Sequence, residues 1–204
     1  MKHGLALPED VSRETVDRLE AYVALLLQWN QTINLISRKD EPEIWTRHIR
    51  DSLALLPLLP PEFPHAIDLG SGGGLPGLVL CIVTGRPFTL IESDQRKAAF
   101  LREAARRTKA PARILAVRIE AAKAPPAPLI TARALAPLPA LLDLSARLLA
   151  PGGICVFPKG RTVQDELTQA ARQWHMRIQQ TVSPTDPTAT ILRLSEIRRV
   201  GPQP

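Results

Sequence analysis

The pattern of apolar and polar residues changes near residue 60. Before that point it has the spacing of helices, and after it short strand-like runs alternate with helical ones. Over residues 11–30 apolar side chains recur every three or four positions, a spacing that predicts an amphipathic helix. A similar spacing predicts a second helix over residues 41–56, and a proline-rich stretch that starts at Pro57 ends it. We therefore expect a helical subdomain over residues 1–60 ahead of a larger domain over residues 61–204.

Beyond residue 65, short β-type runs alternate with helical ones. The expected strands cover residues 66–69, 87–91, 112–117, 128–132 and 154–157, followed by an antiparallel pair at 177–182 and 188–194. The expected helices cover residues 75–83, 94–109, 135–149 and 162–175, and a turn is expected at 151–153. This alternation indicates an α/β fold with a doubly wound, mostly parallel seven-stranded sheet.

A glycine-rich turn follows the first of these strands. The segment Asp68–Gly77 reads D-L-G-S-G-G-G-L-P-G and leads from a strand into a helix. Glycines suit a turn that needs positive φ or close approach to a ligand, because a Cβ would be in the way. The next strand ends in Glu92, where an acid can accept hydrogen bonds from both ribose hydroxyls of an adenosine. The pair of features predicts a cofactor that contains adenosine.

The acid in front of the turn discriminates between two such cofactors. The spacing Gly72-x-Gly74-x-x-Gly77 also matches the dinucleotide fingerprint. Asp68, however, would oppose a pyrophosphate with like charge, whereas S-adenosylmethionine has no phosphate and carries a sulfonium and an ammonium. The loop therefore favours a methyltransferase over a dehydrogenase, and an unrelated glycine-rich turn in another α/β protein stays an alternative.

Basic residues follow the later strands. Arg118, with Ile119 and Glu120 beside it, comes after the third strand, Arg133 after the fourth and Lys159 after the fifth. Functional residues of open α/β sheets collect at the carboxyl ends of the strands. We therefore expect these three cations to face one crevice, an arrangement that fits a substrate with phosphates.

The composition agrees with a polyanionic partner. The 204 residues include 26 Lys and Arg against 20 Asp and Glu, which gives a formal net charge of +6 and favours nucleic acid; a generally basic composition is the alternative. Cys81 and Cys155 lie in apolar runs and are expected to be buried free thiols of a reducing cytoplasm. We expect no metal site, no membrane span and no signal peptide, and therefore a cytoplasmic protein.

Longer motifs carry a resemblance to a known family. They are W-N-Q-T-I-N-L-I-S (29–37), R-H-I-R-D-S-L (47–53), D-L-G-S-G-G-G-L-P-G (68–77), I-E (119–120), A-R-A (132–134) and K-G (159–160). With these motifs the chain resembles, over nearly its whole length, the RsmG (GidB) family of bacterial 16S ribosomal RNA guanine-N7 methyltransferases. The resemblance implies a class I (Rossmann-like) methyltransferase fold, S-adenosylmethionine as cofactor and 16S rRNA as substrate, at the decoding-region loop of the small subunit.

The resemblance also implies roles for individual residues. The expected cofactor-binding residues are Asp68, Gly70, Gly72, Leu75, Glu92, Ile119, Glu120 and Arg133. The expected catalytic or substrate-side residues are Arg133, Lys159, His48, Asn34 and Arg118. The chain departs from the family pattern at Ile36, Glu92 and Val117, where threonine, aspartate and serine are common. We expect a monomer that acts on rRNA either naked or within the small subunit.

The residues themselves agree with guanine N7 as the target. No Asn/Asp-Pro-Pro-Tyr run follows the fourth strand, where the chain reads T-A-R-A-L, which argues against methylation of an exocyclic amine. Guanine N7 has a free lone pair and needs placement instead of a strong base. An NAD(P)-dependent oxidoreductase would need a Tyr-x-x-x-Lys pair, and the single tyrosine is Tyr22. A non-catalytic RNA-binding module would need stacking aromatics, and aromatic residues make up only 4% of the chain.

Overall fold

The computed structural model describes residues 11–201. Its first element, α1 (Arg13–Asn30), confirms the predicted amphipathic helix. The Ser12 side chain accepts a hydrogen bond from the Thr15 amide and so caps the helix start. Leu19, Tyr22 and Leu26 on its inner face are fully buried.

The prediction of one continuous helix over residues 41–56 is wrong, because the segment is divided into short helical pieces of different types. The segment consists of a 3₁₀ helix (Arg38–Glu43), a π-helix (Trp45–Ile49), a short α2 (Arg50–Leu53) and a 3₁₀ turn (Leu56–Leu58). Pro42 lies inside the first of these and lacks the amide that a regular helix would use. A π-helical turn is rare and is found mostly at functional sites, and this one carries Arg47 and His48.

The seven-stranded sheet is confirmed. Its strands are β1 (Ala66–Leu69), β2 (Phe88–Ile91), β3 (Ala112–Leu115), β4 (Ala127–Ala132), β5 (Leu149–Lys159), β6 (Trp174–Val182) and β7 (Thr190–Arg199). They lie in the order β3-β2-β1-β4-β5-β7-β6. β1 to β5 are parallel, and β7 runs antiparallel to both β5 and β6. The carboxyl ends of β1 to β5 therefore meet at one edge of the sheet.

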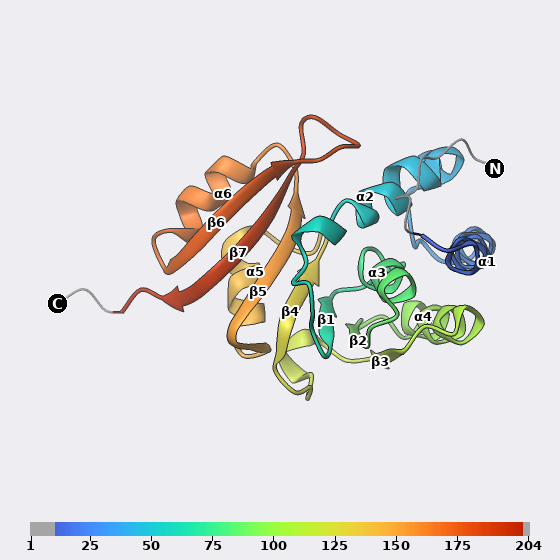
Figure 1. The fold of residues 1–204 in the computed structure, drawn as a ribbon, viewed down its shortest axis with the longest axis horizontal. Coiled ribbons are helices and arrows are strands. Elements are labelled where there is room, and N and C mark those ends of the chain that lie inside the picture. Colours follow the sequence, from blue (N-terminus) through green and yellow to red (C-terminus); the bar gives the residue numbers. More distant parts are fainter. Residues whose placement is uncertain (1–10, 202–204) are drawn as a thin grey trace.

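Helices cover both faces of this sheet (Figure 1). α3 (Gly77–Thr84) and α4 (Gln95–Thr108) pack with α1 on one face. α5 (Leu138–Ala146) and α6 (Val163–Ala170) pack on the other. Side chains of α1 belong to the same hydrophobic core as side chains of β2 and β4. The helical N-terminal part thus shares its core with the sheet, and the division of the chain at residue 60 stays a prediction.

Several element boundaries near the C-terminus differ from those expected. The turn expected at 151–153 lies inside β5, where Gly152 has a φ of +74° and the register with β4 shifts. The helix expected to reach residue 175 ends at Ala170, because Trp174 turns into the core as the first residue of β6. β7 continues beyond the expected residue 194 to Arg199, whose guanidinium lies over the Trp174 ring.

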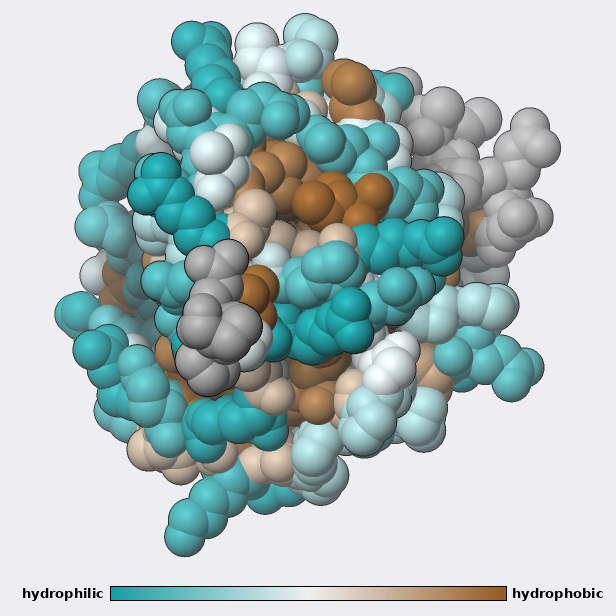
Figure 2. Space-filling view, turned by 90° about the vertical axis from the view of Figure 1, so that its left-hand side faces the viewer, coloured by the Kyte–Doolittle hydropathy of each residue, from teal (hydrophilic) through white to brown (hydrophobic). Residues whose placement is uncertain are grey.

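The outer strand β6 forms one edge of the sheet. Figure 2 shows this side of the molecule as mostly hydrophilic, with apolar residues gathered towards its middle. Ile178 and Val182 of β6 are the exposed apolar residues of this strand, at 41% and 63%. Cys81 and Cys155 are buried and unpaired, as expected, and burial raises the pKa of each thiol to about 12. Among residues 11–201, no helix has the length and apolar character that a membrane span requires.

Candidate functional site

The glycine-rich turn after β1 has the backbone geometry that the sequence predicts. Gly70, Gly72 and Gly74 have φ values of +63°, +53° and +87°, which residues with a Cβ rarely adopt. A Cβ on Gly77 would clash with the side chain of Asp68. The turn therefore brings α3 close against β1. At Gly72, in contrast, no described side chain apart from its sequence neighbours lies within 4 Å of where a Cβ would be.

Asp68 lies fully buried beneath this turn. Its Oδ1 accepts a hydrogen bond of 2.6 Å from Thr131 of β4. Its Oδ2 has no hydrogen-bond partner within the described part of the chain. Burial raises the pKa of this carboxyl to about 6. Nearby groups of Ser71 and Gly77 and the Arg133 charge act in the opposite direction and lower this pKa. A buried carboxylate oxygen without a donor is nevertheless uncommon, and a cationic ligand near the turn would stabilise it further.

Glu92 supports the turn from the end of β2. Its Oε2 accepts a hydrogen bond of 2.8 Å from the Gly72 amide, and its Oε1 one of 2.8 Å from the Asp94 amide. The residue is only 8% exposed. A carboxylate can accept about four hydrogen bonds. Glu92 therefore fixes the turn and keeps acceptor capacity for two ligand hydroxyls.

A cavity of about 400 Å³ opens beside these residues, which is within the usual range for small-molecule sites. Its lining comes from the carboxyl ends of β1 and β2, the segment after β3 and the segment after β4. The lining includes Gly70, Gly72, Glu92, Arg118, Ile119, Glu120, Ala134, Leu135 and Ala136. The structure thus brings together six of the predicted site residues. Asp68 and Leu75 are buried, and Arg133, which was also predicted to bind the cofactor, is not among the residues that line the cavity.

The segment after β4 forms one wall of this cavity in a strained conformation. Ala134 has a φ of +51°, a left-handed conformation that costs roughly 1–2 kcal/mol in a residue with a Cβ. Leu135 lies over Gly70, with its Cδ1 about 2.6 Å from where a Gly70 Cβ would be. The A-R-A motif marked this segment in the sequence, but the backbone strain could not be inferred from it.

Arg133 forms the centre of a polar network at the end of β4. Its Nη1 lies 3.1 Å from His48 Nδ1 and 3.4 Å from Asp51 Oδ2. Asp51 Oδ1 in turn accepts hydrogen bonds from Ser183 and Thr185 in the β6–β7 turn. Burial, with help from the Arg133 charge, lowers the pKa of His48 to about 4. The imidazole is therefore neutral at pH 7, and Nδ1 can accept from Arg133.

Two predicted substrate-side residues are placed elsewhere. Lys159 Nζ lies 2.5 Å from Glu166 Oε2 and donates to the Ala136 carbonyl at 3.0 Å. It does not line the cavity. Asn34 is exposed on the segment after α1. Their roles toward the substrate stay predictions.

Two buried polar residues outside the predicted site set hold backbone near the site in place. Asn30 is buried, donates to Glu41 Oε1 at 2.6 Å and accepts from the amides of Leu35 and Ile36. Tyr22 donates from its hydroxyl to the Gly73 carbonyl at 2.5 Å. The signal for Tyr22 was its place among the apolar positions of α1, which predicts burial but no partner.

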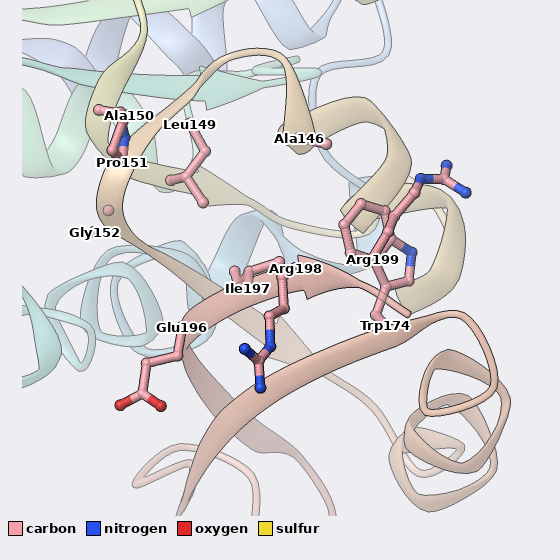
Figure 3. Close-up of a pocket in the computed structure, with 11 residues that line it drawn as sticks. Ala146, Leu149, Ala150, Pro151, Gly152, Trp174, Glu196, Ile197, Arg198 and Arg199 are labelled. Atoms are coloured by element: carbon pink, nitrogen blue, oxygen red, sulfur yellow. The ribbon is translucent and has the colours of Figure 1, made fainter. Parts of the chain in front are cut away.

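A cavity of about 690 Å³ lies at the opposite edge of the sheet, at the start of β5 and the end of β7. In Figure 3 the charged ends of Glu196 and Arg198 extend away from the loop at Pro151. Arg199 stacks on Trp174 and pairs with Asp143. This cavity is remote from the glycine-rich turn, and no group of three or more potential metal ligands occurs within residues 11–201.

The geometry can be compared with known proteins. The family model described as "rRNA small subunit methyltransferase G" (GidB) matches residues 15–189. "Ribosomal RNA small subunit methyltransferase G" of Acidiphilium cryptum is 59% identical over 215 residues, covering 97% of this chain and 98% of that protein. The protein of the same name from Granulibacter bethesdensis is 57% identical over 190 residues, covering 93% and 89%.

Solved structures share the fold at low identity. An O-methyltransferase from Bacillus cereus in complex with SAH superposes with a TM-score of 0.57 at 15% identity, covering 86% of this chain and 91% of that chain. The 16S rRNA methyltransferase RsmC of T. thermophilus, in complex with AdoMet and guanosine, gives 0.54 at 17% identity, covering 76% and 40%. These similarities show the class I methyltransferase fold.

Proposed function

The chain belongs to the rRNA small subunit methyltransferase G family, and from this we propose that it transfers a methyl group from S-adenosylmethionine to N7 of a guanine in 16S rRNA. The observation that carries the proposal is the cavity at the carboxyl ends of β1 and β2, where Glu92 and the glycine-rich turn converge. Relatives named ribosomal RNA small subunit methyltransferase G match almost the whole chain.

The residues of the cavity fit the cofactor. The acids of the lining are Glu92 and Glu120, and the bases Lys97 and Arg118 line it too. Asp68 is fully buried, and its Oδ2 has no hydrogen-bond partner among residues 11–201. An acid at this turn suits a ligand with a sulfonium and an ammonium and would oppose a pyrophosphate. Glu92 would hold the ribose hydroxyls, and the turn at Gly70 and Gly72 would lie against the rest of the molecule. When bound, the cofactor supplies a methyl group on a positively charged sulfur.

The substrate side rests on Arg133. His48 and Asp51 hold its guanidinium at the end of β4, where it can bind a phosphate or the guanine O6. Neutral His48 acts here as an acceptor for Arg133 and takes no proton from the guanine, since N7 has none to lose. Orientation of the base then supplies most of the rate acceleration. Arg118, exposed at the cavity rim, adds a second cation for the RNA.

A dinucleotide-dependent oxidoreductase is disfavoured by Tyr22. The hydroxyl of this single tyrosine is buried and bonded to the Gly73 carbonyl, and burial raises its pKa. It is therefore not available as the acid of a Tyr-x-x-x-Lys pair. We further propose that the enzyme works as a monomer in the cytoplasm, on RNA either naked or assembled in the small subunit.

The test is methyl transfer from labelled S-adenosylmethionine to 16S rRNA, offered naked and within small subunits. Label in the RNA is expected, and the form that accepts it identifies the stage of assembly. Cofactor binding in a parallel titration without label in either form would contradict the substrate. Failure to bind the cofactor would contradict the reaction class.

A further inference from the structure

A largely buried ion pair contacts the chain next to the cavity wall. Lys159 ends β5 and Glu166 belongs to α6, and Lys159 Nζ lies 2.5 Å from Glu166 Oε2. The two side chains are only 9% and 14% exposed. A cation with so little exposed surface has little left to offer an RNA phosphate, which argues against the direct contact expected from the sequence.

Both members of the pair bind the backbone of the same segment. Lys159 Nζ donates to the Ala136 carbonyl at 3.0 Å. Glu166 Oε2 accepts from the Leu138 amide at 2.8 Å, and its Oε1 accepts from Thr162 at 2.8 Å. The pair thus holds the chain on both sides of Pro137.

This segment depends on outside partners. α5 starts after Pro137, whose own side chain makes no cap hydrogen bond. The Leu138 amide is one of the donors that a helix start leaves without a partner inside the helix, and Glu166 supplies its acceptor. Upstream, Ala134 is in the left-handed region, a conformation that persists only when its surroundings enforce it. Ala134, Leu135 and Ala136 all line the cavity beside Gly70.

We propose that Lys159 and Glu166 are positioning residues that hold the Ala134–Ala136 wall of the cofactor cavity through the backbone of Ala136 and Leu138. Neither touches the reacting atoms. The pair sets the place of Leu135 over Gly70, and so acts on cofactor affinity through backbone contacts alone. The inference rests on the proposed function for the identity of the ligand, and it moves Lys159 from the RNA side of the reaction to the cofactor side.

The test compares Lys159→Met, Glu166→Gln and the double variant. Binding of S-adenosylhomocysteine is measured by calorimetry without RNA, and exchange of the Leu138 amide is measured by NMR. Each single variant is expected to bind S-adenosylhomocysteine about 10-fold more weakly than the wild type. The double variant should bind no more weakly than either single variant, because each substitution disrupts the same group of contacts. Exchange at Leu138 should accelerate in all three, and Lys159→Arg should retain most of the affinity.

Arg177→Met is the matched control, because Arg177 pairs with Glu196 at 3.5 Å on an exposed part of the β6–β7 hairpin; it should bind like the wild type. Unchanged affinity in both single variants, with a raised KM for RNA in Lys159→Met alone, would overturn the proposal in favour of an RNA contact. Additive losses in the double variant would also overturn it. If Lys159→Met does not fold, Glu166→Gln and Lys159→Arg decide by the same binding and exchange measurements.

Failure of the proposed function gives a different result. Wild-type protein that binds S-adenosylhomocysteine but does not label 16S rRNA would contradict the substrate, while the comparison of variants would still decide on the positioning role. Wild-type protein that does not bind S-adenosylhomocysteine would contradict both.

Discussion

Replacing Glu92 by alanine removes the one side chain that we expect to bind both the turn and the ribose. Its two oxygens accept from the amides of Gly72 and Asp94, and we expect their remaining lone pairs to accept from two ligand hydroxyls. Hydrogen bonds to a charged group contribute at least about 1.5 kcal/mol each. Losing two of them should therefore weaken cofactor binding by about 3 kcal/mol, on the order of 100-fold.

The assay is calorimetric titration with S-adenosylhomocysteine, which needs no RNA. Glu92→Gln keeps one carbonyl oxygen as acceptor and should lose only about 10-fold. Glu103→Gln is the matched control, because Glu103 lies on α4 and pairs with Arg106 at the surface; its affinity should equal that of the wild type. An affinity of Glu92→Ala within about threefold of the wild type would refute the ribose role.

Three further predictions concern the end of β4. Arg133→Ala should lower the rate of methyl transfer, measured by single-turnover labelling, at least about 100-fold, while the affinity for S-adenosylhomocysteine changes far less. An undiminished rate would show that Arg133 is not part of the substrate site. Ala134→Gly should raise the free energy of unfolding, measured in urea, by about 0.5–1 kcal/mol. Glycine removes the strain of the left-handed φ of +51°, and the greater freedom of glycine in the unfolded chain offsets part of this gain. A loss of stability would contradict the strain. In the folded state the pKa of His48 is about 4, below its ordinary 6.5, so the unfolded chain binds the proton first and the free energy of unfolding falls as pH drops from about 6.5 to about 4. In His48→Gln this fall should be shallower. A pH profile of the variant that runs parallel to that of the wild type would contradict the burial argument.

The strands could be predicted because each is a short apolar run that the sheet buries on both faces. Ala66–Leu69 and Phe88–Ile91 are buried at every position, so their sequences carry a clear signal. The segment after α1 could not be predicted in detail, since its π-helical turn depends on contacts of His48 and Asp51 with residues about 80 to 130 positions away. Trp174 ends a predicted helix for a similar reason, because it joins a core formed by distant strands.

The geometry of the glycine-rich turn was easier to predict than the surroundings of the strand-end cations. Glycine at a positive φ and an acid at a strand end are local requirements, and Gly70, Gly72 and Glu92 lie where those rules place them. Lys159 also ends a strand, but its partner Glu166 lies on the next helix and draws it away from the cavity. Only the fold shows which strand-end cations remain free for a substrate.

The identity of the methylated base tests the proposed reaction most directly. 16S rRNA treated with the enzyme and S-adenosylmethionine, naked and in small subunits, would be digested to nucleosides and fragments and examined by mass spectrometry. We predict 7-methylguanine at one position in the decoding region, and its absence when Glu92→Ala replaces the wild type at low cofactor concentration. Methylation at an exocyclic amine, at a ribose hydroxyl or on a pyrimidine would contradict it.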